Sequence, residues 1–162
     1  MSDRSLPPAA AWSLVAAQFM LLILLGFLPW GSLWARGIDT LVIGLTLVVL
    51  GVILAVIAGT GLGRALTPTP VPRESAELTT TGIYGLVRHP IYTGLLILGI
   101  GLVVIGASVF HLLAWVALLV LLAAKARVEE WMLLDRYDGY ASYAARVGRL
   151  VPGIGRIPTT EA

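Results

Sequence analysis

Three long stretches of the chain contain no aspartate, glutamate, lysine or arginine, and they limit the possible fold more than any other feature. They cover Leu6–Ala35, Thr40–Gly63 and Pro90–Ala124. A membrane-spanning helix needs about 20 consecutive apolar residues, so each stretch is long enough to cross a bilayer. The chain has 58% hydrophobic and only 12% charged residues, whereas soluble domains carry about 25% charged residues. This composition, with a mean hydropathy of +0.92, indicates an integral membrane protein.

The third stretch is too long for a single crossing. As one straight helix its 35 residues would extend roughly 52 Å at ~1.5 Å per residue, against a hydrocarbon core of ~30 Å. The chain must therefore fold back, and Gly106–Ser108 is the best position for the reversal. The returning helix then needs the residues up to Glu130 to complete its length. This hairpin brings Glu129 and Glu130 to the interface where Arg88 and His89 precede the first arm.

We therefore expect an all-α fold, an integral membrane helical bundle that forms a single domain over residues 1–162. Its four transmembrane helices are expected near residues 9–30, 40–63, 88–107 and 110–130. After Glu130 the sequence becomes amphipathic and predicts one C-terminal interfacial helix on the membrane surface, ended by Gly148 and Pro152. Its apolar and aromatic face would contain Trp131, Leu134, Tyr137, Tyr140 and Tyr143, and we interpret these tyrosines as an interfacial belt.

The basic residues are distributed very unevenly along this arrangement. Ten of the eleven lysines and arginines fall in segments assigned to one side of the membrane, and only Arg36 lies on the other. Basic residues concentrate in cytoplasmic loops, so we expect a multi-pass plasma (inner) membrane protein with both termini and the polar cluster in the cytoplasm. The net charge of +2 follows from this pattern and does not indicate a nucleic-acid partner.

Two further features exclude classes of chemistry. The chain has no cysteine, which excludes disulfides, thiolate metal sites and cysteine nucleophiles. Its two histidines, His89 and His111, stand far apart and show no metal-ligand spacing. We therefore expect no metal centre.

Residues 81–94 read TGIYGLVRHPIYTG and place ionisable side chains where the chain re-enters lipid. Proline suits the first position of a helix, so His89-Pro90 predicts a helix start. Backbone N–H groups at such a start favour an anionic ligand group, and Arg88 could add a charge-assisted contact to a carboxylate or phosphate. The alternative is that Arg88 only follows the positive-inside rule and His89 only caps the helix.

The paired carboxylates also allow two interpretations. Glu129 follows Lys125 by four residues and Glu130 follows Arg127 by three, so both could form ordinary ion pairs on a helix surface. A carboxylate pair at a lipid boundary is equally suited to holding a cation. Adjacent helical residues point about 100° apart, so we expect one glutamate to face the site and the other to be solvated.

The C-terminal half of the chain resembles a known family. TTGIYGLVRHPIYTG, then a hydrophobic hairpin, then VEEWMLLDRYDGYASYAARVGRLVP is similar to the isoprenylcysteine carboxyl methyltransferases and the related phospholipid N-methyltransferases. The similarity covers Ala76–Pro152, and the combination of these motifs is specific. The resemblance implies S-adenosyl-L-methionine as methyl donor, bound in a cytoplasm-facing pocket formed by residues 76–94 and 125–152.

The resemblance and the polar cluster together suggest individual site residues. The expected cofactor-binding residues are Glu77, Leu78, Thr79, Tyr84, His89, Pro90, Ile91, Tyr92, Gly94, Glu129 and Glu130. The expected catalytic residues are Arg88, Lys125 and Glu129. Lys125 stands where the prenylcysteine enzymes have a substrate-contacting arginine, and a lysine is weaker at bidentate carboxylate recognition.

The implied function is methyl transfer to a lipophilic small molecule or lipid, with membrane lipids as surroundings. The accepting group remains open between carboxylate, amine and thiol, because only an amine acceptor requires a base or a lowered pKa. A sterol-reductase-like NADPH enzyme is a second possibility, although the phosphates of NADPH call for basic residues where Glu129 and Glu130 stand. A small transporter is a third, although transporters usually place an acidic residue within a span. The oligomeric state is also open.

Overall fold

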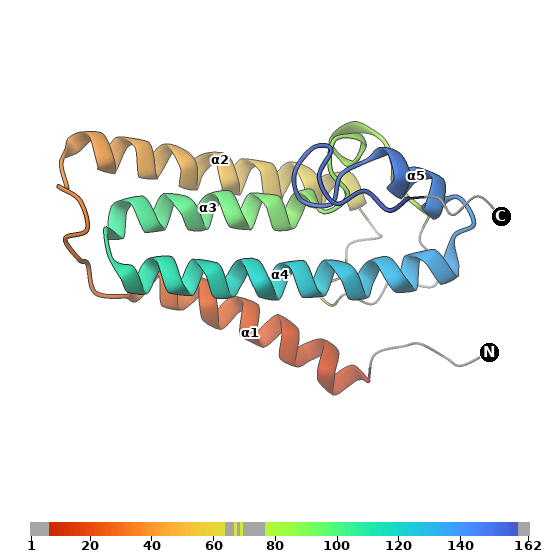
Figure 1. The fold of residues 1–162 in the computed structure, drawn as a ribbon, viewed down its shortest axis with the longest axis horizontal. Coiled ribbons are helices and arrows are strands. Elements are labelled where there is room, and N and C mark those ends of the chain that lie inside the picture. The colour runs from red at the N-terminus through yellow and green to blue at the C-terminus, as the bar shows by residue number, and fades with distance from the viewer. Residues whose placement is uncertain (1–6, 64–66, 68, 70–76, 159–162) are drawn as a thin grey trace.

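The computed structural model describes residues 7–63, 67, 69 and 77–158. Within these residues the chain is helical, with two isolated β-bridges and no strand, which confirms the expected all-α class. Four long helices lie along one another and a short helix covers one end of the bundle (Figure 1). The elements in chain order are α1 (Pro8–Phe27), α2 (Ile38–Leu62), the 3-10 helix η2 (Gly82–Gly85), α3 (Pro90–Gly106), α4 (Val109–Arg136) and α5 (Tyr140–Arg146).

Three of these helices, α1, α2 and α4, are long and apolar enough to cross a membrane. The fourth, α3, is equally apolar but has 17 residues, which corresponds to about 26 Å at ~1.5 Å per residue. It is thus a few ångströms shorter than the ~30 Å hydrocarbon core. α1–α4 lie where the four spans were expected, and crossing of the membrane by all four stays a prediction. The surfaces of these helices expose large apolar side chains such as Ile53 and Val120. The chain is a multi-pass membrane protein.

The reversal between α3 and α4 occurs at the predicted position. α3 ends at Gly106, Ala107 adopts a left-handed conformation with φ 45°, and Ser108 caps α4 with its hydroxyl. The connection between α1 and α2 is hydrogen-bonded to this turn, because the N–H groups of Gly31 and Leu33 donate to the carbonyls of Gly106 and Ala107. Arg36 lies in the same connection, at the end of the bundle remote from α5 (Figure 1).

Glycines allow α2 and α3 to approach closely. A Cβ atom built on Gly51 would lie 2.5 Å from the carbonyl oxygen of Gly94, and one on Gly101 would lie 2.5 Å from that of Gly44. Such small-residue contacts are typical of membrane helix pairs. Gly94 therefore serves helix packing and does not line the cavity described below. α2 occupies the space beside it, and the cofactor role expected for Gly94 stays a prediction.

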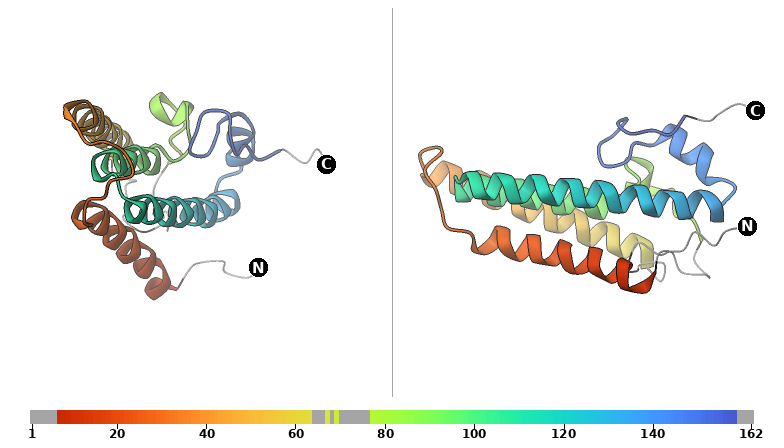
Figure 2. Two further views of the ribbon diagram at one scale, coloured as in Figure 1. Left: turned by 60° about the vertical axis from the view of Figure 1, so that its left-hand side comes forward. Right: turned by 60° about the horizontal axis from the view of Figure 1, so that its bottom comes forward.

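The amphipathic C-terminal segment is divided between two helices, in contrast to the single interfacial helix expected. α4 continues to Arg136, six residues beyond the expected end of the span, and α5 is a separate helix of seven residues. The chain turns at Asp138-Gly139 and α5 folds back toward the end of the bundle (Figures 1 and 2). Tyr140 and Tyr143 are consequently buried in a small cluster with Ala144 and Val147, so the belt interpretation of these two tyrosines was wrong.

Candidate functional site

A cavity of about 230 Å³ lies at the end of the bundle that carries α5. By the same kind of measure a single water needs ~10–15 Å³, so this cavity can hold a ligand of many atoms. Residues 77–79, η2 and the start of α3 form one part of its wall, and the other parts come from α1, α2, α4 and α5. Every helix of the described chain therefore contributes to it.

Most of the residues expected from the sequence meet at this cavity. Of the expected cofactor-binding residues, nine line it, namely Glu77, Leu78, Thr79, Tyr84, His89, Pro90, Ile91, Tyr92 and Glu129. Arg88 and Lys125 line it as well. Gly94 and Glu130 do not line the cavity, because Gly94 packs against α2 and the Glu130 side chain is buried in an ion network.

Backbone pairing between two distant segments fixes the start of α3. The N–H groups of Arg88 and His89 donate to the carbonyls of Gly148 and Arg149, at 2.8 and 3.1 Å. The Thr93 hydroxyl adds a hydrogen bond of 2.7 Å to the carbonyl of Leu150. The C-terminal loop thus takes the two N–H groups that immediately precede α3. The first-turn N–H groups of the helix itself, where the sequence suggested an anionic ligand, belong to Ile91 and Tyr92, which both line the cavity.

Glu130 is the centre of a buried ion network. Its Oε1 accepts from Arg88 Nε at 2.8 Å and Nη2 at 2.6 Å, and its Oε2 accepts from Arg149 Nε at 2.8 Å and Nη2 at 2.6 Å. The side chain is 1% exposed. The expectation that one glutamate would be solvated was therefore wrong, and Glu130 pairs with Arg88 and Arg149 instead of with Arg127, the partner in the alternative interpretation. Arg149, nineteen residues further along, folds back to supply the second positive charge.

Arg88 is fully engaged by the protein itself. Besides Glu130, its guanidinium donates to the carbonyls of Ala144, Val147 and Gly155. It therefore holds α5 and the following loop against α4. This arrangement argues against the expected catalytic contact between Arg88 and a substrate, because its donors are occupied within the protein.

Glu129, in contrast to its neighbour, reaches the cavity. Its side chain is 27% exposed, and its Oε2 accepts a hydrogen bond of 3.1 Å from the hydroxyl of Tyr92. The same oxygen lies 3.4 Å from Nδ1 of His89, whose ring is stacked on that of Tyr92 at 5.4 Å between centroids. Tyr92 in α3 and His89, the N-cap residue of α3, therefore fix the position of the Glu129 carboxylate.

His89 lies between both glutamates. Its Nε2 is 3.2 Å from Glu130 Oε1, while Nδ1 faces Glu129. A neutral imidazole has only one N–H group, so both contacts are favourable only in the protonated form. Burial would lower the pKa of His89, but the hydrogen bonds and charges of Glu129 and Glu130 outweigh burial and raise this pKa above its ordinary value. His89 is thus a positively charged link between two carboxylates.

Lys125 is buried next to a polar residue of the first helix. Its Nζ donates to Gln18 Oε1 at 2.5 Å and lies 5.2 Å from the centre of the Tyr92 ring. The lysine is 1% exposed, and both Gln18 and its neighbour Phe19 line the cavity. Sequence reasoning missed this contribution of α1. The available signal was a glutamine inside an otherwise apolar span, because polar groups at that depth are costly and usually functional.

The tyrosines of α5 and η2 form a connected wall. Tyr143 donates to the carbonyl of Tyr84 at 2.6 Å, and Tyr84 donates to the carbonyl of Ala58 in α2 at 3.1 Å. Burial raises the pKa of Tyr143 to about 12, so this donor keeps its proton. α5 is thereby connected to α2 through η2 across one side of the cavity.

Comparison with curated proteins identifies related sequences. The chain is 34% identical over 113 residues to protein-S-isoprenylcysteine O-methyltransferase B of Arabidopsis thaliana, an alignment covering 67% of this chain and 57% of that protein. It is 31% identical over 144 residues to cobalt-zinc-cadmium resistance protein CzcN of Cupriavidus metallidurans, covering 87% and 62%. The chain therefore spans less than two thirds of the length of these relatives.

The fold is also shared with a solved structure. The eukaryotic intramembrane Ras methyltransferase ICMT superposes with a TM-score of 0.68 at 24% sequence identity, over 94% of this chain and 56% of that one. In addition, residues 40–139 match the family model described as phospholipid methyltransferase. This match begins in α2, includes the cavity-lining part of α3 and ends beyond α4. The chain belongs to the phospholipid methyltransferase family.

Proposed function

We propose that the protein is an S-adenosylmethionine-dependent methyltransferase that acts on a lipophilic acceptor at the membrane surface. The observation that carries this proposal is the Glu129 carboxylate, which reaches the cavity and is fixed there by Tyr92 and His89. Membership of the phospholipid methyltransferase family supports the reaction class.

The cavity residues fit the proposed cofactor chemically. S-adenosylmethionine supplies a methyl group activated on a sulfonium. Both contacts that the described residues make to Glu129 use Oε2, which leaves Oε1 for hydrogen-bond donors of the cofactor, such as ribose hydroxyls or its ammonium group. The aromatic ring of Tyr84 in the cavity wall suits flat or cationic groups, and residues 77–79 complete this side of the cavity.

The role of the protein in this reaction would be alignment. Methyl transfer is an in-line displacement and depends on the positions of donor and acceptor more than on covalent help. The sulfonium charge decreases as the reaction approaches the transition state, so a carboxylate directly against sulfur would stabilise the ground state more. A carboxylate that binds other groups of the cofactor avoids this loss, and we assign that role to Glu129.

Few side chains at the cavity can act as a general base toward the methyl acceptor. His89 lies between two carboxylates and Glu130 is saturated by Arg88 and Arg149, so neither is suited to accept a proton from a substrate. Among the carboxylates in the described part of the cavity wall, Glu129 and Glu77 are then the groups that could accept a proton from an amine acceptor. A carboxylate or thiolate acceptor would need no base.

We further propose that the acceptor reaches the site from the lipid. Phe19 of α1 and Leu62 of α2 line the cavity, and the outer faces of both helices expose large apolar residues, including Met20 and Ile57. Lipophilic acceptors partition into the bilayer, so an opening toward lipid raises their local concentration. Methyl transfer should then be much faster to a long-chain acceptor than to its short-chain analogue at equal concentration, and equal rates would contradict this route.

Ligand binding separates the proposed function from its alternatives. Purified protein in lipid nanodiscs would be titrated calorimetrically with S-adenosylhomocysteine and, separately, with NADPH. We expect binding of S-adenosylhomocysteine only. Binding of NADPH alone would favour a reductase. The phosphates of NADPH call for basic residues, and the donors of Arg88 in the cavity wall already have protein partners. Binding of neither would favour a transporter.

A further inference from the structure

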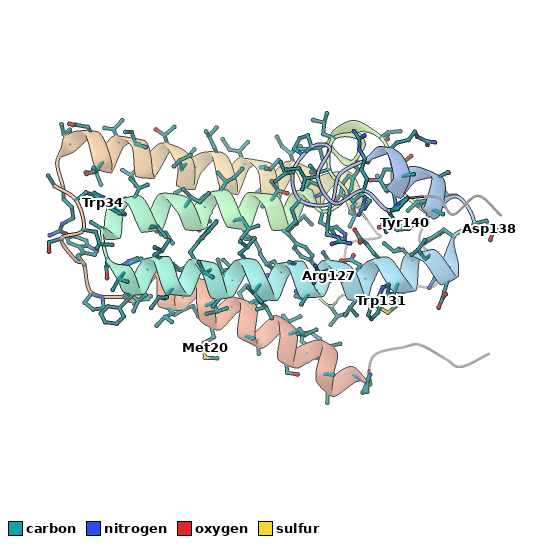
Figure 3. All side chains as sticks on the ribbon, in the orientation of Figure 1. Met20, Trp34, Arg127, Trp131, Asp138 and Tyr140 are labelled. Atoms are coloured by element: carbon teal, nitrogen blue, oxygen red, sulfur yellow. The ribbon has the colours of Figure 1, made fainter. Side chains whose placement is uncertain are left out.

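Tyr140 carries a buried hydroxyl group that has no hydrogen-bond partner among the described residues. It is the first residue of α5, is 1% exposed, and belongs to the cavity wall. Figure 3 labels it at the side of α5 that faces α4. Buried polar side-chain atoms in proteins nearly always have a partner, so such an exception calls for a specific explanation.

Three neighbouring tyrosine hydroxyls of the cavity wall are used inside the protein. Tyr143 donates to the Tyr84 carbonyl, Tyr84 to the Ala58 carbonyl, and Tyr92 to Glu129. These three hydroxyls therefore have structural partners. The hydroxyl of Tyr140 lies within the same wall and lacks one.

Docking of α5 does not depend on the Tyr140 hydroxyl. Arg88 holds the carbonyls of Ala144 and Val147, and the N–H of Ile157 donates to the Ala144 carbonyl. Tyr143 supplies a further link to η2. A phenylalanine at position 140 would fill the same volume and avoid burying an unpaired hydroxyl, so folding alone does not explain a tyrosine there.

The protonation of the Tyr140 hydroxyl indicates what kind of hydrogen-bonding group could be its partner. Burial raises the pKa of Tyr140 well above its ordinary value, so the group stays protonated and can donate. Its O–H donor is unused, and the partner that would satisfy this donor is a hydrogen-bond acceptor. Away from bulk water a hydrogen bond is electrostatically stronger than in solution, so a ligand acceptor that reaches Tyr140 would gain more there than at an exposed site.

We propose that Tyr140 is a ligand-binding residue whose hydroxyl donates a hydrogen bond to an acceptor atom of the adenosyl ligand in the cavity. This inference rests on the proposed function, because it takes the ligand to be an adenosyl compound. It assigns α5 a direct contact with that ligand in addition to its packing role. The hydroxyl is closed to water in the structure, so binding requires a small outward shift of the cavity wall at α5.

The test compares Tyr140→Phe with Tyr143→Phe, which removes a hydroxyl from the same helix and the same cavity wall. Thermal unfolding without ligand and the dissociation constant for S-adenosylhomocysteine would be measured for both variants in nanodiscs. We expect Tyr140→Phe to keep or raise the unfolding temperature while its affinity falls about 3- to 10-fold, the effect of one hydrogen bond. Tyr143→Phe should lower the unfolding temperature, because its hydroxyl has a protein partner.

Two results would overturn the inference. One is an unchanged affinity in Tyr140→Phe. The other is a loss of ligand-free stability as large as that of Tyr143→Phe, because this would give the hydroxyl a structural role. Failure of the proposed function is distinguishable, because the wild-type protein would then not bind S-adenosylhomocysteine at all. Repeating the titrations with 5′-methylthioadenosine locates the acceptor: an equal loss places it in the nucleoside, and a loss seen only with S-adenosylhomocysteine places it in the amino-acid part.

Discussion

Arg88 and Glu130 form an ion pair of 2.6 Å in which both side chains are 1% exposed. The pair joins the segment before α3 to the cytoplasm-assigned end of α4, across 42 positions of sequence. Through the other donors of Arg88 it also holds α5 and the C-terminal loop. This pair therefore connects the start of α3, α4 and α5, three of the segments that line the cavity.

Replacing Glu130 by glutamine should therefore damage the fold more than the site. Arg88, Arg149 and His89 would keep their positive charges in a buried place without compensation, and breaking a buried pair in this way costs about 3–5 kcal/mol. We expect a large decrease in the unfolding temperature of Glu130→Gln in nanodiscs. An unfolding temperature equal to that of the wild type would show that the network contributes little.

The adjacent substitution, Glu129→Gln, should have the opposite pattern. The Glu129 carboxylate is partly exposed in the cavity and makes polar contacts only with Tyr92 and His89 among the described residues, fewer partners than Glu130 has. Charge-assisted hydrogen bonds contribute about 1.5–3 kcal/mol, so affinity for S-adenosylhomocysteine should fall at least about tenfold with little change in unfolding temperature. Calorimetric titration measures the first quantity, and wild-type affinity would remove Glu129 from the binding site.

The charge of His89 makes stability depend on pH. Glu129 and Glu130 face its two nitrogens, with Arg88 and Tyr92 beside it, and its pKa in the folded protein is raised. Its contribution to stability is therefore complete below the unfolded value of about 6.5 and is lost as pH rises through the higher folded pKa. The difference in unfolding temperature between the wild type and His89→Gln should be largest below pH ~6.5. It should decrease as the pH rises from there through the folded pKa of His89. A difference independent of pH would contradict a protonated His89.

Gly94 provides a test of helix packing that is separate from the site. A Cβ atom there would lie 2.6 Å from the Gly51 carbonyl oxygen and 2.9 Å from the Ala55 nitrogen, so Gly94→Ala should push α2 and α3 apart. Overpacking of this kind costs about 1–3 kcal/mol, visible as a lower unfolding temperature. Gly26→Ala is the matched control, since no atom lies within 4 Å of its added Cβ. Equal behaviour of the two variants would argue against close packing of α2 on α3.

The orientation of the bundle is a prediction from its basic residues. Arg36 lies at one end, and α5 with the beginning of α1 lies at the other (Figures 1 and 2). Reporter fusions at residue 36 and at the C-terminus should therefore report opposite sides of the membrane, with the C-terminus cytoplasmic. Reporters on the same side would contradict the four-span topology.

The hairpin and most of the cavity wall could be predicted because they depend on length and local pattern. The charge-free run of residues 90–124 required a reversal, and that reversal brought Glu129 to His89. The resemblance to known methyltransferases added residues 77–79 and Tyr84, which line the cavity.

The features that could not be predicted depend on contacts between distant segments. The burial of Glu130 follows from Arg149, which reaches it only because the C-terminal loop pairs with the start of α3. Likewise, Gln18 becomes part of the site only through the packing of α1 on α4. Neither relation leaves a periodic signal in a single sequence.

The most direct test of the proposed function is transfer of a radiolabelled methyl group. Nanodiscs containing the wild-type protein, with lipids extracted from the source membrane as acceptors, would be incubated with S-adenosylmethionine labelled in its methyl group. We expect label in the organic-soluble fraction with the wild type and at least a tenfold lower rate with Glu129→Gln at subsaturating donor. If the wild-type protein binds S-adenosylhomocysteine but no label above the protein-free level enters lipid, water-soluble or protein-bound material, the proposed reaction is contradicted.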